Sequence, residues 1–383
     1  MTRLESLQTR RKIQIVDLTL QYQNIKDEIE SAVREVLSSG YYILGKNVES
    51  FENELRDYLG CRYVVSCANG TDAIVLSLMA LGIKQDDEVI TVSHSFFATS
   101  EAISLVGAKP VFVDIQEEDF NIDPKQIEPL ITKKTKAIIP VHLYGHPCEI
   151  QSVKEIAVTH GLYLIEDCAQ ALGAKYNNHF AGTFGDTGAF SFFPTKNLGC
   201  FGDGGAICTN DKNIAQKIKE LRIHGSPERY VHSYIGLNSR LDEIQAAILR
   251  VKLKYLNKWN NLRQEAAKYY DELFKDMEEI QTPVVKPNCN HIFHQYTIRT
   301  KKRDSLYEKL KEQGIGTSIY YPIPIHKQKA FSYLNVGAIH ELPLPLTEKL
   351  AGEILSLPMY PEITHGIQEY VVENIRDILN NKL

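Results

Sequence analysis

One lysine in this chain has the surroundings of a nucleophile. Lys196 follows an apolar run that ends at Phe193, and a glycine-rich segment, residues 202–205, comes soon after it. Desolvation lowers the pKa of a lysine amine, and a neutral amine attacks an aldehyde to form a Schiff base. Taken alone, Lys196 is more simply interpreted as the start of an exposed turn, because most lysines are exposed. The other polar segments favour the nucleophilic amine over the exposed turn.

A carboxylate ends another predicted buried strand. Asp167 follows the apolar run that includes Ile165, at the carboxyl end where open α/β sheets bind their ligands. A carboxylate there can pair with the pyridine nitrogen of pyridoxal 5′-phosphate (PLP) and keep the ring an effective electron sink. The alternative interpretation of Asp167 is a helix cap.

Two further segments offer groups for a flat, phosphorylated ligand. Residues 68–73 join a predicted strand to a helix, so the amides near Gly70 and the hydroxyl of Thr71 could bind phosphate, or could simply begin a helix. Phe96 follows the strand that ends at Val92 and could stack on a cofactor ring, although core packing also explains it.

The elements around these residues predict a mostly parallel sheet. Between about residues 60 and 210, short β-rich apolar runs alternate with helical patterns, as in successive βαβ units. We expect a large α/β domain whose seven strands are sandwiched by helices. The seven predicted strands are residues 63–66, 88–92, 109–113, 137–141, 163–165, 189–192 and 205–209.

The C-terminal third predicts a small α+β domain. Helical spacing over residues 244–256 continues into a charged stretch, 258–279, which predicts a long helix leading out of the first domain. We place the boundary near Lys252, which gives domains of residues 1–252 and 253–383. The small domain should contain a strand, a helix and a second strand, at residues 295–299, 303–313 and 317–321.

Composition excludes several classes of protein. The chain of 383 residues has a formal net charge of −5 and no block of like charges, so we expect no nucleic-acid partner. It lacks an apolar run of about 18 residues, so we expect no membrane span and a cytoplasmic protein. Its seven cysteines form no Cys-x-x-Cys pair, and His291 and His294 have no third ligand nearby, so we expect free thiols and no metal site.

A glycine-rich loop also invites comparison with dinucleotide-binding proteins. Residues 202–205 read Gly-Asp-Gly-Gly, which lacks the Gly-x-Gly-x-x-Gly spacing, and they precede a predicted strand instead of opening a helix. A nicotinamide-dependent dehydrogenase is therefore disfavoured.

In this order, the segments resemble the DegT/DnrJ/EryC1/StrS sugar aminotransferase family of PLP fold type I, the aspartate aminotransferase-like fold. The resemblance covers nearly the whole chain. It begins at Asp17 and residues 40–45, passes through all the segments above, and continues through residues 238–242 and 321–324.

The resemblance implies roles for the central residues. Lys196 would bind the cofactor covalently and then move protons, Asp167 would pair with the pyridine nitrogen, and Gln170 would contact the cofactor ring or its hydroxyl.

It also implies how the rest of the cofactor is held. Thr71 and Ser191 would bind the phosphate, with Gly70 supplying backbone, and Phe96 would stack on the ring. Asn238 would reach the phosphate of the neighbouring subunit, which implies a homodimer with shared active sites.

Five residues match the family's sugar-nucleotide site. Tyr41 and Arg240 belong to this set, Arg240 from the partner subunit, together with Tyr320, Tyr321 and His326.

The implied reaction is transfer of an amino group from L-glutamate to a nucleotide-linked keto sugar. The C-terminal pattern is similar to members that aminate C3, and we favour a dTDP-linked 3-keto-6-deoxyhexose, for amino-sugar or polysaccharide biosynthesis. Some relatives that act on uronates carry His-Tyr at Tyr320-Tyr321. The alternatives are a UDP-linked N-acetyl-3-keto-hexuronate or a 4-keto sugar, then a sugar dehydratase, which would carry histidine at Lys196, or a regulator without turnover.

Overall fold

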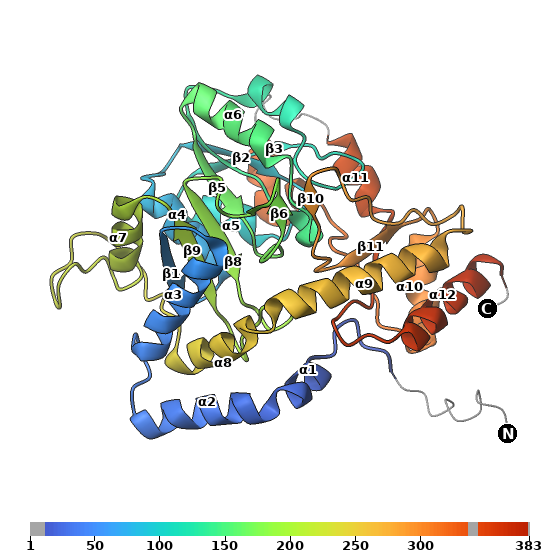
Figure 1. Ribbon diagram of the computed structural model, residues 1–383. Coiled ribbons are helices and arrows are strands. Elements are labelled where there is room, and N and C mark those ends of the chain that lie inside the picture. Colours follow the sequence, from blue (N-terminus) through green and yellow to red (C-terminus); the bar gives the residue numbers. More distant parts are fainter. Residues whose placement is uncertain (1–11, 336–343, 382–383) are drawn as a thin grey trace.

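A seven-stranded sheet forms the centre of the molecule, which we describe from a computed structural model for residues 12–335 and 344–381 (Figure 1). The strand order is β1-β9-β8-β5-β4-β2-β3. All seven predicted strands are present, with ends shifted by up to two residues. They are β1 (Tyr63–Cys67), β2 (Glu88–Val92), β3 (Lys109–Val113), β4 (Thr135–Ile139), β5 (Tyr163–Asp167), β8 (Thr187–Ser191) and β9 (Gly205–Thr209).

The sheet is mostly parallel, and its one reversed strand is preceded by the loop that carries Lys196. Strand β9 runs antiparallel to both β1 and β8. It follows β8 directly, so the intervening loop, which carries Lys196, lies at the carboxyl end of β8. Asp167 pairs with Ala189 in the register of β5 and β8, which places its carboxylate at the same edge of the sheet.

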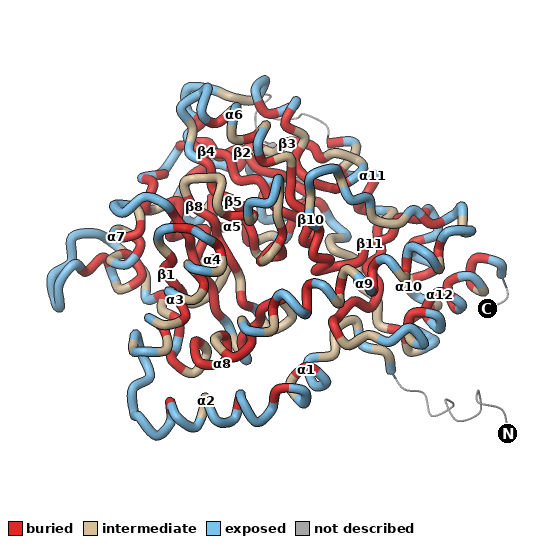
Figure 2. Tube along the Cα trace, in the orientation of Figure 1, coloured by how far each residue is buried: buried red, intermediate tan, exposed pale blue. Residues whose placement is uncertain are grey.

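Helices cover both faces of this sheet. On one face, α4 (Gly70–Ala80), α5 (Ala98–Leu105) and α7 (Lys212–Leu221) pack on alternate strand residues such as Val65 and Ala189. On the other face lie α3 (Lys46–Leu59), α6 (Ile150–His160) and α8 (Glu243–Leu253), packed on residues such as Phe190. The strands are therefore buried on both sides, as Figure 2 shows, and this explains their nearly continuous apolar sequences.

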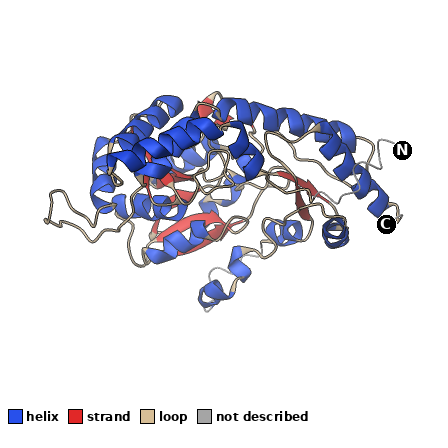
Figure 3. Ribbon diagram, turned by 90° about the horizontal axis from the view of Figure 1, so that it is seen from below, coloured by secondary structure: helices blue, strands red, loops and turns tan. Residues whose placement is uncertain are grey.

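A long helix, α9 (Leu256–Phe274), connects this part of the chain to a smaller group of elements. There a two-stranded sheet of β11 (Tyr296–Arg299) and β12 (Ile354–Leu357) packs with α10 (Arg303–Glu312) and α12 (His365–Leu379). Figure 3 shows this sheet well separated from the central one. The predicted helix over residues 244–279 is thus two helices that meet at Lys254 and Tyr255. The division near Lys252, at the end of α8, stays a prediction.

The other elements lie around these two cores. Helix α2 (Lys26–Ser39) packs on α8, α1 (Leu18–Asn24) precedes it, and both expose most of their outer surface (Figure 2). A small sheet joins β6 (Lys175–Tyr176), β7 (His179–Phe180) and β10 (Cys289–Asn290), and α11 (Pro345–Ala351) precedes β12. No helix in the described ranges is both long and apolar enough to cross a membrane.

The predicted strand at residues 317–321 is wrong. Only Ser318 pairs, with Ser356 of β12, and the chain then leaves the sheet. The cause is a pair of contacts with the central domain, because the carbonyl oxygen of Tyr320 accepts a hydrogen bond from Tyr144, and the hydroxyl of Tyr321 accepts one from Gln170. The true partner of β11 is β12, whose four residues are too few for their pattern to be distinctive.

Candidate active site

Lys196 lies in a tight turn directly after β8. Its backbone N–H donates to the carbonyl oxygen of Phe193 at 2.8 Å, and farther along the same loop the N–H of Cys200 donates to Phe192 at 2.7 Å. The lysine side chain is half-buried. Desolvation lowers its pKa to about 8, and attraction to Asp167 partly opposes this shift. The amine is therefore within electrostatic reach of the carboxylate that the sequence singles out.

Asp167, at the end of β5, is held by two donors. The hydroxyl of Thr99 in α5 donates to Oδ2 at 2.7 Å, and the backbone N–H of Ala169 donates to Oδ1 at 3.1 Å. Thr99 in turn lies 3.2 Å from the hydroxyl of Ser95. Both Thr99 and Asp167 are buried. The carboxylate thus has a fixed orientation, and it can still accept further hydrogen bonds, because two oxygens offer about four lone-pair positions.

The first turn of α4 meets the end of β8 at Gly70. The helix begins there, and its cap residue Asn69 accepts from the N–H of Asp72 at 2.8 Å. The first intrahelical bond runs from Ala73 to Asn69, so the amides of Gly70 and Thr71 have no carbonyl within the helix to bind. A Cβ at Gly70 would lie 2.6 Å from Cβ of Ser191, so only glycine permits this approach. Helix dipole, free amides and two hydroxyls make a suitable place for a phosphate.

Aromatic rings and an amide border the same region. Gln170 accepts from the backbone N–H of Tyr144 at 2.7 Å and donates to the hydroxyl of Tyr321 at 3.2 Å. The ring of Tyr321 lies 5.8 Å from that of Phe96, which is 56% exposed. Phe96 is thus no core residue, and its ring face is available to a ligand. The structure brings Lys196, Asp167, Gln170, Phe96 and Tyr321 into one connected region.

Tyr41, Asn238 and Arg240 lie on a second pair of adjoining segments. Ile43 and Asp242 form an isolated β-bridge that joins the two segments. The hydroxyl of Ser239, between Asn238 and Arg240, accepts from the N–H of Ala68 at 3.1 Å, beside the start of α4. Tyr41 is 71% exposed and Asn238 is also exposed. Their predicted contacts with substrate and with a partner's cofactor stay predictions.

His326 has both ring nitrogens engaged within the protein. Nδ1 lies 2.6 Å from the hydroxyl of Ser93, just after β2, and Nε2 lies 3.2 Å from a carboxylate oxygen of Glu348. Burial lowers the pKa of His326, and the hydrogen bond to Glu348 opposes this. These contacts fasten the segment that carries Tyr320 and Tyr321 to the sheet edge. A direct contact of His326 with substrate stays a prediction.

Comparison with known proteins places the whole arrangement in one family. The model of the DegT/DnrJ/EryC1/StrS aminotransferase family matches residues 23–376. This chain belongs to that family.

Three relatives show the range of functions within the family. A protein named pleiotropic regulatory protein, from Geobacillus stearothermophilus, is 48% identical over 95% of this chain and 98% of its own. A dTDP-3-amino-3,4,6-trideoxy-alpha-D-glucose transaminase from Micromonospora megalomicea is 43% identical, covering 94% and 97%. A UDP-2-acetamido-2-deoxy-3-oxo-D-glucuronate aminotransferase from Pseudomonas aeruginosa is 44% identical, covering 91% and 95%.

A solved structure in the family has the same fold. DesV of S. venezuelae, in complex with a ketimine intermediate, superposes with a TM-score of 0.92 at 40% identity, over 96% of this chain and 98% of that one. Family and fold together make this chain a PLP-dependent aminotransferase. The geometry fits that cofactor, since a lysine with a lowered pKa, a buried carboxylate and a glycine cradle at a helix N-terminus lie around one region.

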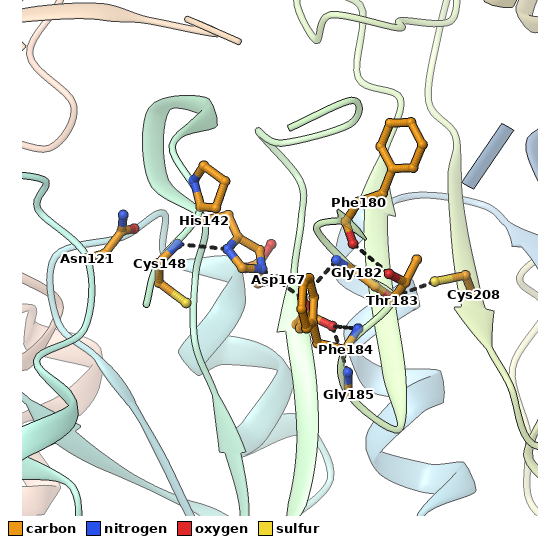
Figure 4. A network of polar contacts seen from close by, with 12 residues as sticks. Asn121, His142, Cys148, Asp167, Phe180, Gly182, Thr183, Phe184, Gly185 and Cys208 are labelled. Atoms are coloured by element: carbon orange, nitrogen blue, oxygen red, sulfur yellow. Dashed lines mark hydrogen bonds and ion pairs between the residues drawn. The ribbon is translucent and has the colours of Figure 1, made fainter. Parts of the chain in front are cut away.

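A second cluster of polar side chains has the composition of a metal site. His142, Glu166 and Cys168 offer ligand atoms within 4.8 Å of one another, all buried. Two of the three already make hydrogen bonds within the protein (Figure 4). Glu166 accepts from His142 and from the backbone N–H groups of residues 182, 184 and 185, and His142 Nδ1 accepts from the backbone N–H of Cys148. We interpret this cluster as a structural network that fixes the end of β5.

The sequence did not single out three residues that hold candidate site residues in place. Thr99 orients Asp167, Tyr144 orients Gln170, and Ser239 ties residues 238–240 to the α4 turn. Thr99 and Ser239 each have a local signal, because Thr99 lies three residues after Phe96 and Ser239 lies between Asn238 and Arg240.

Proposed function

We propose that the enzyme transfers an amino group from L-glutamate to C3 of a dTDP-linked 3-keto-6-deoxyhexose. The amino-transfer part of this proposal is supported by the amine of Lys196, whose pKa is lowered to about 8 and which interacts electrostatically with the fixed Asp167. The dTDP-linked sugar is supported by the relative from Micromonospora megalomicea, which is named for a dTDP-3-amino sugar. The product would enter amino-sugar or polysaccharide biosynthesis.

Each protein group has a definite task in this proposal. PLP, when bound, supplies an electron sink for the carbon that loses or gains a proton. Lys196 would hold the cofactor covalently through its aldehyde, and its amine would then take and return that proton, for which a pKa near the working pH is best. Asp167 keeps the pyridine nitrogen protonated, and Gln170 faces the ring or its hydroxyl.

The remaining predicted contacts hold the two ligands. Gly70, Thr71 and Ser191 bind the phosphate. Phe96 stacks on the cofactor ring. The sugar nucleotide lies beside Tyr320, Tyr321 and His326. Tyr41 and Arg240 also contact it, from the two segments that the bridge between Ile43 and Asp242 joins, with Arg240 coming from the partner subunit.

We also propose a homodimer in which Asn238 reaches the partner's phosphate. Exposed apolar side chains support it, because Tyr230 and Ile235 in the loop before Asn238 are 81% and 90% exposed. An open apolar groove on α1 and α2, next to Phe201, gives further unburied surface. The seven cysteines are free and six of them are buried, which supports a reducing compartment such as the cytoplasm.

The first experiment tests amino transfer. The PLP-loaded protein receives L-glutamate, and 2-oxoglutarate and the cofactor's absorption are followed, with Lys196→Ala as the control. We expect one 2-oxoglutarate per bound cofactor and loss of the visible absorption band. If neither L-glutamate nor any other amino donor yields its corresponding 2-oxo acid, the assignment is overturned in favour of a dehydratase or a regulator.

The second experiment identifies the acceptor. The same protein, charged with the amino group, receives a dTDP-linked 3-keto-6-deoxyhexose, a UDP-linked N-acetyl-3-keto-hexuronate or a 4-keto sugar nucleotide. Mass spectrometry then finds the amino sugar. The relative from Pseudomonas aeruginosa makes the uronate the second candidate, and preference for it over the dTDP-linked sugar would contradict the first proposal.

Mixed dimers test the shared site. Lys196→Ala and Asn238→Ala chains are each inactive or weakened alone, but a hybrid dimer keeps one complete site if Asn238 acts across the interface. Random mixing should then recover about a quarter of the wild-type activity. If Asn238 acts in its own subunit, each site of the hybrid has one defect and nothing is recovered.

A further inference from the structure

The residue after the reactive lysine has a completely bound side chain. Asn197 is 5% exposed, and its Oδ1 lies 3.0 Å from Nδ1 of His294. Its Nδ2 donates to Oδ1 of Asn260 at 2.7 Å and to the carbonyl oxygen of Ile292 at 3.4 Å. Asn260 belongs to α9, while Ile292 and His294 precede β11. The loop after β8 is therefore tied to two elements outside the central sheet.

The hydrogen bonds determine which nitrogen of His294 carries its hydrogen. Asn260 donates through Nδ2 to the carbonyl oxygen of Leu172 at 3.2 Å, so its oxygen faces Asn197. Asn197 must present its NH₂ group to that oxygen and its own oxygen to His294. Nδ1 of His294 is consequently a donor. Nε2 is left as an acceptor, and the amide nitrogen of Gln295 lies 3.4 Å from it.

The histidine is also held without charge. His294 is buried, and desolvation places its pKa well below the ordinary value. Repulsion from Lys196 acts in the same direction, which places the imidazole within electrostatic reach of the reactive amine. A charged residue here would repel a lysine ammonium, whereas neutral imidazole supplies one directional donor.

We propose that His294 and Asn197 are positioning residues for Lys196: neutral His294 donates Nδ1–H to Asn197 and thereby fixes the adjoining lysine in its turn. The inference rests on Lys196 as the cofactor-binding amine. Consecutive residues share a peptide unit, so immobilising the Asn197 side chain restricts the backbone from which the Lys196 side chain extends. Lys252, from α8, adds a bond to the carbonyl oxygen of Gly199 at 2.6 Å, on the far side of the same loop.

Two substitutions at His294 separate the donor from the bulk of the ring. The amide nitrogen of asparagine falls near the position of Nδ1, whereas that of glutamine falls near Nε2. His294→Asn should keep the bond to Asn197, and His294→Gln should lose it. His291→Asn is the matched control, because His291 is equally buried in the same segment and its Nδ1 accepts from the backbone N–H of Phe293.

The readouts are hydrogen exchange of residues 196–201 in the apoprotein, and the rate at which PLP becomes covalently attached. For His294→Gln we expect exchange about 10-fold faster and attachment about 10-fold slower, the effect of one lost buried hydrogen bond. His294→Asn and His291→Asn should stay within about 3-fold of wild type. If His294→Gln does not fold, Asn197→Ala removes the same bond from the other side.

Equal behaviour of His294→Asn and His294→Gln, or unchanged exchange in Asn197→Ala, would overturn the inference. Neither readout involves a sugar nucleotide. If wild-type protein attaches PLP but aminates none of the proposed acceptors, the proposed function fails and the positioning pair stands. If PLP attaches to no lysine in wild-type protein, both fail.

Discussion

Thr99 donates its hydroxyl hydrogen to Oδ2 of Asp167 at 2.7 Å, and both side chains are buried. The bond joins the first turn of helix α5 to the end of strand β5, 68 residues apart in the chain. It fixes the orientation of the carboxylate, which interacts electrostatically with the amine of Lys196. Helix α5 therefore both covers the sheet and orients the carboxylate of Asp167.

Thr99→Val keeps the shape of the side chain and removes this donor. We expect PLP to bind more weakly and turnover to fall about 10- to 100-fold, since hydrogen bonds to charged groups contribute more than neutral ones. Thr99→Ser is the matched control and should stay close to wild type. The measurements are PLP titration by absorbance and steady-state kinetics. Equal activity of the valine and serine variants would contradict an orienting role for this hydroxyl.

The pKa of Lys196, lowered to about 8 by desolvation, predicts how the apoprotein takes up PLP. Only neutral amine attacks an aldehyde, and roughly a quarter of the amine is neutral at pH 7.5, against roughly one part in a thousand for an ordinary lysine. Attachment should therefore accelerate about 10-fold per pH unit below pH 8 and level off above it. Stopped-flow absorbance measures the rate. Acceleration that continues to pH 10 would show an unshifted lysine.

Gly70 permits the close approach between α4 and β8. In Gly70→Ala the new Cβ would lie 2.6 Å from Cβ of Ser191, so either the helix or the strand must move. We expect PLP affinity to fall about 10-fold or more, because phosphate ligands depend on placement to a fraction of an ångström. A second substitution, Ser191→Gly, removes the atoms that the new Cβ would meet. It should restore the helix–strand approach and part of the lost PLP affinity, even though one hydroxyl is lost.

The control for that glycine lies in α12. A Cβ at Gly366 meets no atom within 4 Å, so Gly366→Ala should leave PLP binding unchanged and stabilise the helix by up to about 1 kcal/mol. Equal loss of PLP affinity in both alanine variants would show that the effect at Gly70 is not local.

Lys252 is a buried lysine outside the reaction. Its ammonium donates to the carbonyl oxygen of Gly199 and lies 5.4 and 5.9 Å from the rings of Phe201 and Trp259. Desolvation lowers its pKa to about 8, with Cys200 and Glu362 opposing. Below pH 8 both folded and unfolded chains are charged here, and keeping that charge buried costs about 3 kcal/mol. Between pH 8 and 10.5 the unfolded chain binds more protons, so this group's cost falls as pH rises.

Lys252→Met should abolish that pH-dependent contribution. We expect the apoprotein's gain in denaturation midpoint between pH 7.5 and 9.5 to be larger for wild type than for Lys252→Met, measured by urea unfolding. Lys254→Met, at an exposed position, is the control and should follow wild type. The same pH dependence in all three proteins would mean that Lys252 titrates at an ordinary pKa.

Local sequence predicted the central sheet well, because short apolar runs are enough to identify its strands. The roles of Lys196 and Asp167 stay predictions, but their places at strand ends follow from the same local pattern. Five-residue apolar runs form strands wherever both faces are covered, and Lys196 and Asp167 follow directly on such strands. The orienting contacts join residues far apart in the chain. Thr99 and Asp167 are 68 positions apart, and Asn197 and His294 are 97 apart. The local sequence around one residue of such a pair therefore does not predict its partner.

The predicted strand at residues 317–321 is wrong for the same reason. Their β-branched and aromatic residues suit a strand. In the structure, however, the carbonyl oxygen of Tyr320 accepts from Tyr144 and the hydroxyl of Tyr321 accepts from Gln170, and both donors belong to the central domain. Tertiary contacts overrode a local preference of about 1 kcal/mol or less.

Glu166 forms the centre of the buried network beside β5. Its two oxygens accept from His142 at 3.0 Å and from three backbone N–H groups at 2.7 to 2.8 Å. Glu166→Gln replaces one acceptor oxygen by a donor, so two buried N–H donors would face an NH₂ group. We expect a loss of about 3 to 5 kcal/mol in the free energy of unfolding, as for other broken buried pairs. Urea unfolding measures it, with the exposed Glu155→Gln as the control. Stoichiometric zinc in the purified protein, lost together with stability on chelation, would instead show that His142, Glu166 and Cys168 bind a metal.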